Sequence, residues 1–236
     1  MSRTPSQLDA EILDRLLAAG RSGAPAPAGD DGAVDYDWSV PRHFTNDQSA
    51  RLEEFVRTLT GKLAEAIGGL FQSQAEVKPC GAEEHYLSGL RAEYAQAGGG
   101  YSLPLSDAGG AACGAVVLGE AATWSYLGRL LGGGSSTPPE GREMSALERS
   151  LVQDVFVALA GALGGALGEM GGEAPTAGEV ARGVSLGEGE EEYWRVRFQE
   201  GGGDGPPNIT FLLRSEMLDA VVGSGQGAAA GAADER

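Results

Sequence analysis

Two capping boxes, each followed by a long apolar stripe, constrain the fold of this chain more than any other feature. Thr45 with Gln48 and Ser145 with Glu148 have the spacing at which the first turn of a helix satisfies its own backbone. Apolar residues then recur at helical spacing to about residue 71 and to about residue 170. The second stripe comprises Leu147, Leu151, Val155, Phe156, Leu159, Leu163 and Leu167. The sequence therefore predicts two long helices, each with one buried face.

The segments after each long helix follow a similar order. We expect a shorter helix over 82–97, with Leu87, Leu90 and Tyr94 inward, then strands at 101–106 and 112–119 and a helix over 120–131. After the second long helix come a weak strand near 179–186, strands at 193–199 and 208–214, and a short helix over 215–222. Each half, 45–131 and 145–222, thus has a long capped helix, a hairpin and a short helix. This pattern predicts an α+β domain with long helices packed on a mostly antiparallel sheet.

The two ends of the chain differ from this central region in composition. Residues 1–19 form an amphipathic segment, and residues 20–35 are a Gly/Pro/Ala-rich linker. The folded domain is expected over 36–222, followed by a Gly/Ala tail over 223–236. The amphipathic segment either docks on its own domain or folds when it binds a partner, and its isolation behind the linker favours the partner.

Charge and residue usage exclude several classes of function. A formal charge of -17, from 34 acidic and 17 basic residues, opposes nucleic-acid binding. Cys80 and Cys113 have no nearby cysteine, and His43 and His85 are the only histidines, so neither a disulfide framework nor a metal site is expected. No apolar leader or membrane span is recognised in the sequence. We therefore expect a soluble cytoplasmic protein without a metal or another cofactor.

The stretch GRLLGGGSSTPPE, residues 128–140, is the main candidate site. A phosphate-binding loop would follow a strand and carry a lysine before its helix, but these glycines follow a helix and no lysine comes after them. Gly132 could simply end the helix in a left-handed conformation. Three consecutive glycines favour instead an exposed loop whose backbone a partner protein approaches. Arg129, Arg142 and Arg149 flank it, either solvated or paired with an acidic partner surface.

Three motifs in order resemble the flagellar motor switch protein FliM family. They are SQLDAEILDRLL (6–17), YDWSVPRHFTNDQSARLE (36–53), and RLLGGGSS followed by LERSLVQDV. The resemblance implies a pseudo-twofold middle domain, shared with CheC-type phosphatases, behind a disordered N-terminal arm. It departs from the family at Gly128, where the motif has an aspartate. It also departs after residue 222, where the tail is too short for a FliN-like domain. Either FliN-like contacts would then come from another chain, or the protein is a divergent relative with a reduced role.

The same resemblance implies partners and a location. The switch protein FliG would bind the loop formed by Arg129, Gly132, Gly133, Gly134 and Ser135. Phosphorylated CheY would bind the N-terminal segment through Ser6, Gln7, Glu11, Ile12, Leu16 and Leu17. Neighbouring FliM-like subunits would stand beside it in the C-ring. The protein would then lie in the cytoplasm at the flagellar basal body, against the inner membrane.

A CheC-like phosphatase is the alternative reading. That chemistry needs an acidic residue followed three positions later by an asparagine whose amide positions the attacking water. The comparable positions here pair Glu54 with Arg57 and Asp154 with Val157. The two asparagines of the chain, Asn46 and Asn208, lie elsewhere. We therefore expect a protein that is not an enzyme and has no small-molecule substrate.

Overall fold

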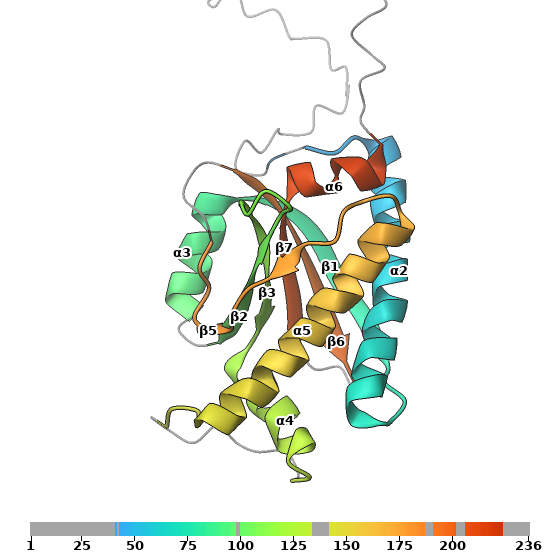
Figure 1. Ribbon diagram of the computed structural model, residues 1–236. Helices are drawn as coiled ribbons and strands as arrows, with labels where there is room; N and C mark the ends of the chain where they lie inside the picture. Colours follow the sequence, from blue (N-terminus) through green and yellow to red (C-terminus); the bar gives the residue numbers. More distant parts are fainter. Residues whose placement is uncertain are drawn as a thin grey trace, which may run out of the picture. The chain divides into compact units, whose positions relative to one another are not determined.

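The structure is built around a central antiparallel sheet, against which the helices pack (Figure 1). The structure is a computed structural model and describes residues 41, 43–97, 100–133, 142–186, 191–201 and 206–223. The chain divides between Asp37 and Trp38 into two units, and every described residue belongs to the second unit. The predicted N-terminal segment, the linker and the Gly/Ala tail lie outside the described residues, apart from Gly223.

Seven strands make up the sheet within the described residues, and all their pairings are antiparallel. Their order is β1-β6-β7-β3-β2-β4, with the short strand β5 also paired to β2. The strands are β1 (Val77–Tyr86), β2 (Tyr101–Ser106), β3 (Ala112–Leu118), β4 (Thr176–Ala177), β5 (Ala181–Arg182), β6 (Glu192–Glu200) and β7 (Ile209–Arg214).

The strand order has a pseudo-twofold symmetry between the two halves of the chain. The hairpins β2–β3 and β6–β7 meet at the centre, where β3 pairs with β7. On the outer side, β1 of the first half pairs with β6 of the second, while β4 and β5 of the second half pair with β2 of the first. Each half therefore completes the sheet of the other, which explains why the repeat folds as one domain.

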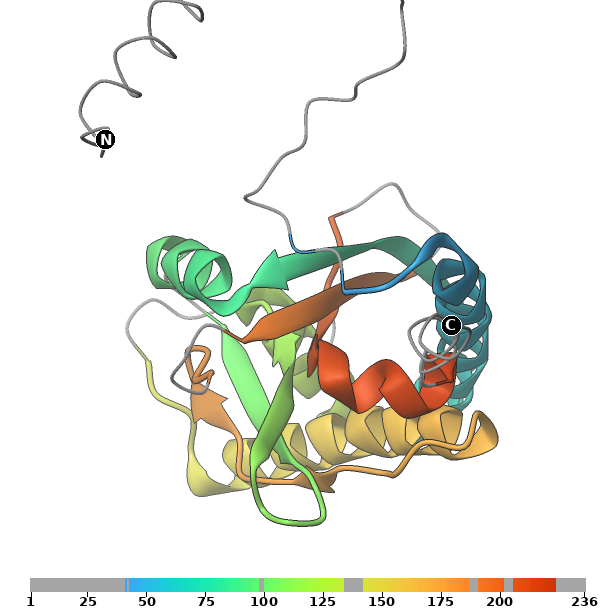
Figure 2. The ribbon, with the colours of Figure 1, turned by 90° about the horizontal axis from the view of Figure 1, so that it is seen from above.

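Helices cover both faces and both ends of this sheet (Figures 1 and 2). The long helices α2 (Asn46–Phe71) and α5 (Ala146–Glu169) pack against each other on one face. On the opposite face lies α3 (Leu87–Ala97), while α4 (Glu120–Leu130) and α6 (Ser215–Val222) lie at opposite ends. Both capping boxes form as the sequence predicts, at Thr45 with Gln48 and at Ser145 with Glu148.

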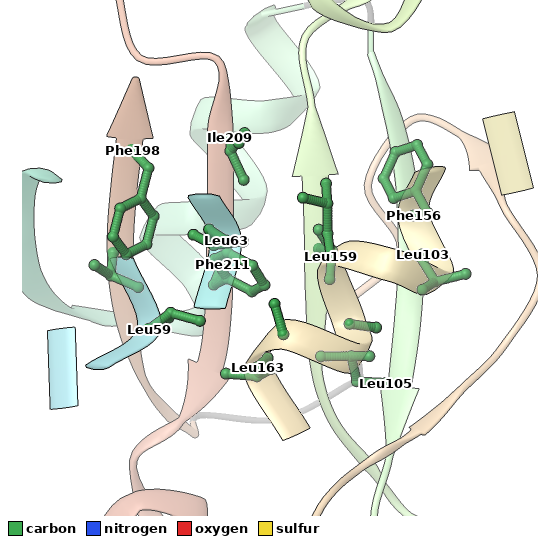
Figure 3. Packing of buried hydrophobic residues seen from close by; sticks show 14 of the residues in the cluster. Leu59, Leu63, Leu103, Leu105, Phe156, Leu159, Leu163, Phe198, Ile209 and Phe211 are labelled. Atoms are coloured by element: carbon green, nitrogen blue, oxygen red, sulfur yellow. The ribbon is translucent and has the colours of Figure 1, made fainter. Parts of the chain in front are cut away.

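The main core lies between the long helices and the sheet. Its side chains interdigitate in Figure 3, where those labelled are Leu59, Leu63, Leu103, Leu105, Phe156, Leu159, Leu163, Phe198, Ile209 and Phe211. A smaller core lies under α3, where Leu87 and Leu90 pack against Ala115, Val117 and Leu212. Residues of β3 alternate between the two cores, because successive side chains of a strand point to opposite faces.

The predicted α+β fold with long helices on an antiparallel sheet is confirmed, and three local predictions are wrong. Residues 77–86 form the strand β1, so the helix expected over 82–97 begins only at Leu87. Within 179–186, where the sequence predicts one weak strand, only the two residues of β5 form a strand, and β4 lies before this range. Leu147, placed in the buried stripe of α5, is 65% exposed because it lies in the first turn, ahead of the packed part of the helix.

Helix α5 is long and apolar enough to cross a bilayer, and no other described helix is. Length and composition alone support that possibility, and half of the apolar window is buried in the domain, as in the core helix of a soluble protein.

Candidate functional site

The glycine loop begins as the C-terminal cap of α4. Gly132 has a φ of +73°, its N–H donates to the Arg129 carbonyl oxygen, and the Gly133 N–H donates to the Gly128 carbonyl oxygen at 2.9 Å. This pair of bonds is a Schellman motif, which satisfies the last carbonyl groups of a helix and favours glycine at the left-handed position. Gly132 therefore does end the helix, which is the simpler of the two interpretations of the sequence.

The cap of α4 does not require a glycine at position 133. A Cβ built on Gly133 would meet the Gly128 carbonyl oxygen at 3.5 Å, which is ordinary van der Waals contact. Its φ also lies outside the range that L-residues avoid. Gly133 is exposed, so a larger residue would project from the surface without disturbing the helix cap. The second glycine leaves the backbone open to contact, and the fold does not require it.

Arg129 holds this loop against two other elements. Its Nη1 lies 2.6 Å from Oε1 of Glu200, at the end of β6. Its guanidinium carbon lies 3.7 Å from the centroid of the Phe71 ring at the end of α2, and that ring stacks on Tyr126. Glu200 is only 11% exposed, so the pair is partly shielded from water. The predicted contact residue Arg129 therefore has a structural role within the domain.

A shallow depression of about 450 Å³ lies between the C-terminal ends of α2 and α4. Leu70, Phe71 and Arg129 line it together with the backbone of Gly132 and Gly133. Beside it Leu131 is 54% exposed, which is unusual for a leucine in this domain. The surface thus offers open backbone and an apolar side chain, a combination suited to a protein partner.

The other two arginines near the loop differ in their contacts. Nη2 of Arg142 lies 2.6 Å from Glu148 Oε1, the carboxylate that completes the second capping box. Hydrogen bonds from Ser145 and the charge of Arg142 lower the pKa of the Glu148 carboxyl, so this cap is charged at neutral pH. Arg149 is exposed and lines a separate pocket with Arg182. Arg142 therefore stabilises α5, whereas Arg149 is exposed on the surface.

Several predicted site residues lie outside the described part of the chain. They are Gly134 and Ser135 of the loop, and Ser6, Gln7, Glu11, Ile12, Leu16 and Leu17 of the N-terminal segment.

The positions compared with a phosphatase site lie on the exposed faces of the long helices. Glu54 and Arg57 are exposed on α2, and Asp154 and Val157 are exposed on α5. Asn46 begins α2, and the Asn208 side chain accepts a hydrogen bond from the Glu200 N–H at 2.9 Å. Neither asparagine therefore stands three positions after Glu54 or Asp154, where that reaction would need an amide.

A cluster of charged side chains around His43 could not be predicted from the sequence. Nδ1 of His43 lies 3.0 Å from Glu192 Oε2, and Nε2 lies 2.9 Å from Asp219 Oδ1. Burial lowers the pKa of His43, but the hydrogen bonds and charges of Asp219 and Glu192 outweigh it and raise the pKa overall. These partners lie far apart in the sequence, so only the folded chain reveals them. Within the described residues, no group of three potential ligands is placed to hold a metal ion.

Comparison with known proteins shows which fold this is. No family model matches the chain, and no curated protein matches it. Among solved structures, FliY of Thermotoga maritima has a TM-score of 0.60 at 12% identity, covering 76% of this chain and 98% of that one. The FliM middle domain from H. pylori has a TM-score of 0.59 at 13% identity, with coverages of 76% and 98%. The chain has the FliM middle-domain fold.

A chain of the FliG–FliM complex from H. pylori is also similar, with a TM-score of 0.56 at 14% identity. The match covers 76% of this chain and 99% of that chain. At such identities the likeness concerns the fold. The pseudo-twofold sheet and paired long helices therefore match the fold of the FliM middle domain, which is the fold that the sequence motifs led us to expect.

Proposed function

We propose that this protein is a component of the flagellar motor switch that binds FliG through the glycine loop and phosphorylated CheY through its N-terminal segment. The proposal includes side-by-side contacts with FliM-like subunits in the C-ring and contacts with a FliN-like protein. It also places the protein in the cytoplasm at the flagellar basal body. The FliM middle-domain fold and the three sequence motifs support these roles.

The glycine-loop surface is the observation that carries the proposal. Its helix cap needs one glycine, at position 132, yet a second follows at position 133 where a side chain would fit. The Arg129–Glu200 pair holds the loop on the ends of α2 and β6, so the exposed backbone has a fixed position. A rigid, side-chain-poor surface beside an exposed leucine is well suited to close approach by a partner. A chain of the FliG–FliM complex shares this fold, which makes FliG the partner to test first.

We also propose that the protein is not an enzyme. The alternative, a CheC-like phosphatase, would require an amide on the exposed faces of α2 and α5. The positions in question carry Arg57 and Val157 instead. Signalling by this protein would then depend on binding, with subunit tilt transmitted through the loop to FliG.

Replacing Gly133 by leucine tests the FliG contact. The added side chain would project into the interface, so we expect binding of FliG to weaken by about tenfold or more, equivalent to roughly 1.4 kcal/mol. The melting temperature should change by less than about 2 °C, because exposed loop substitutions usually have little effect on stability. Titration of FliG by calorimetry, with a thermal melt of each protein, measures both quantities.

Gly89→Leu is the matched control. Gly89 is exposed on α3, and a Cβ built there meets nothing within 4 Å, so the same substitution is made away from the loop. This variant should bind FliG as the unchanged protein does. Equal FliG affinity of the Gly133→Leu protein and the control would contradict the proposed contact.

A further inference from the structure

His43 joins elements that are far apart in the sequence. Its ring nitrogens lie 3.0 Å from a carboxylate oxygen of Glu192, the first residue of β6, and 2.9 Å from one of Asp219 in α6. Its backbone N–H donates to Glu84 of β1 at 2.9 Å. The His43 side chain is 25% exposed, so water competes only in part for these contacts. One residue ahead of α2 is thus bonded to two strands of the sheet and to α6.

The two ring contacts of His43 require a charged imidazole. Ionised carboxylates only accept hydrogen bonds, and a neutral imidazole has a single N–H to donate. A neutral ring between Glu192 and Asp219 would direct a nitrogen lone pair at one of the two carboxylates, so one bond would be lost. Burial lowers the pKa of His43, but the hydrogen bonds and charges of Asp219 and Glu192 outweigh it and raise the pKa overall. In this arrangement the ring therefore carries a proton on each nitrogen.

Other charged groups near the ring have partners of their own. The charged side chains described around His43 are Glu84 of β1, Glu191 and Glu192 at the start of β6, Arg214 at the end of β7, and Glu216 and Asp219 of α6. Nη2 of Arg214 lies 2.6 Å from Glu216 and 3.5 Å from Glu191, so these carboxylates balance the guanidinium. Glu192 and Asp219 therefore depend on His43 for a positive charge.

Helix α6 is the element that loss of this charge can release. It has eight residues, and a helix so short is not stable without tertiary contacts. It lies beside the first turns of α2 (Figures 1 and 2), where Arg51 donates to the Val222 carbonyl oxygen at 2.9 Å. The apolar side chains that it buries in the main core are Leu218, Val221 and Val222. With so few attachments, α6 can open locally at a lower free-energy cost than the long helices.

We propose that His43 is a pH-dependent latch on α6. The charged ring fastens α6 to β6, and loss of one proton releases Asp219 while the remaining N–H stays on Glu192. Asp219 is the end that is released because its side chain is 47% exposed, against 35% for Glu192, so water replaces its hydrogen bond more readily.

The latch opens as the pH rises. The folded-state pKa of His43 is raised, so the contact is complete below about pH 6.5, the usual pKa, and is lost as the pH passes through the higher folded-state value. Opening of α6 uncovers apolar surface of α2, β6 and β7, the elements on which α6 packs. Exposure of this end of the domain thus depends on pH. The inference does not rest on the proposed binding of FliG or CheY.

Hydrogen–deuterium exchange of the full chain tests the latch. Exchange of the amides of residues 215–222 is compared between the unchanged protein and His43→Gln at the same pH, so that the intrinsic pH dependence of exchange cancels. At pH 6 these amides should exchange about fivefold more slowly in the unchanged protein. By pH 9 the two rates should converge, because a neutral ring, like an amide, holds one carboxylate. Amides of α3 are the control and should exchange equally in the two proteins.

Glu192→Gln distinguishes a latch from a contact that is only structural. Its amide can donate to Nδ1 of a neutral ring, so the single N–H of the ring can stay on Asp219. In this variant α6 should remain protected up to pH 9.

Three outcomes would overturn the proposal. The first is a ratio of α6 exchange rates, unchanged protein to His43→Gln, that is the same at pH 6 and pH 9. The second is an equal change of exchange in α3 and α6, which would show destabilisation of the whole domain. The third is a Glu192→Gln protein whose α6 loses protection with rising pH as the unchanged protein does.

Discussion

At the scale of single residues, Arg129 joins the ends of three elements. Its pair with Glu200, at 2.6 Å, combines a carboxylate that is 11% exposed with a guanidinium that is 33% exposed and lies on the Phe71 ring. A partly shielded, charge-assisted bond is stronger than an exposed one. In a double-mutant cycle of Arg129→Gln and Glu200→Gln, we therefore expect a coupling energy of about 1–2 kcal/mol from urea denaturation.

The pair of Arg182 and Glu120 is the control for this cycle. Its closest atoms are 3.4 Å apart, and the side chains are 60% and 34% exposed. Exposed pairs of this kind contribute little, so the coupling between Arg182→Gln and Glu120→Gln should be below about 0.5 kcal/mol. Similar coupling energies in the two cycles would mean that Arg129 has no special structural role at the loop.

His43 should make the free energy of unfolding depend on pH. Its folded-state pKa is raised because Asp219 and Glu192 favour the charged ring more than burial disfavours it. The stabilisation is therefore complete below about pH 6.5, the usual pKa, and is lost as the pH rises through the higher folded pKa. The difference in stability between the unchanged protein and His43→Gln should shrink from pH 6 to pH 9 in urea titrations.

The second histidine is a necessary comparison. Burial and the nearby charge of Arg195 lower the pKa of His85, so protonation of His85 opposes folding at low pH. That contribution is present in both proteins and cancels in the difference. A difference that stays constant across this pH range would show that His43 does not bind its two carboxylates as a charged ring.

The sequence identified some of these residues and could not identify others. Gly132 was recognisable as a helix stop because C-terminal capping depends on local conformation. The sequence predicts Arg129 as a partner contact, but its pair with Glu200 and its stacking on Phe71 join residues far apart in the chain. The same holds for His43, Glu192 and Asp219. Local chemistry can be read from neighbouring residues, whereas long-range pairs require the fold.

At the scale of elements, the pairing of β3 with β7 should be the part least tolerant of added volume. Gly114 pairs with Leu213, and a Cβ built on Gly114 would overlap the Leu212 carbonyl oxygen of the neighbouring strand. Relief would require the two central strands to move apart. We expect Gly114→Ala to lower the free energy of unfolding by about 2–3 kcal/mol or more, as overpacking of a core does.

Gly89→Ala is the matched substitution in a permissive element. A Cβ at Gly89, in the exposed part of α3, meets no atom within 4 Å. Alanine favours a helix over glycine, so this variant should gain up to about 1 kcal/mol. Urea denaturation of both proteins gives the comparison. A Gly114→Ala protein as stable as the unchanged one would mean that β3 and β7 are not as close as the structure places them.

The elements that could be predicted are those with strong local signals. Both long helices have capping boxes and periodic stripes, and the hairpin strands have runs of apolar residues. Strand β1 was missed because VKPCGAEEHY contains proline, glycine and charged residues, with only Val77 buried. An edge strand with a bulge needs few apolar residues, so its pairing with β6 determines its structure more than its own sequence does.

At the scale of the whole molecule, the pseudo-twofold symmetry makes two positions equivalent. Glu54 and Asp154 occupy the same place relative to the caps Thr45 and Ser145 of α2 and α5. Both are exposed, as are Arg57 and Val157 three positions later. A phosphatase of this architecture would have two equivalent sites, one on each long helix. The symmetry therefore allows a single test to address both halves.

We expect the protein to leave the dephosphorylation rate of phosphorylated CheY unchanged. Each candidate site has a carboxylate, at Glu54 or Asp154, but neither has the amide that would position the attacking water. Release of inorganic phosphate from phosphorylated CheY, followed at increasing concentrations of the protein, measures this rate.

The double variant Arg57→Asn, Val157→Asn supplies an amide in both halves. A higher rate in that variant alone would assign the inactivity to the missing amides. A rate that rises with the concentration of the unchanged protein would contradict the non-enzyme proposal and support a phosphatase with a different water-positioning group.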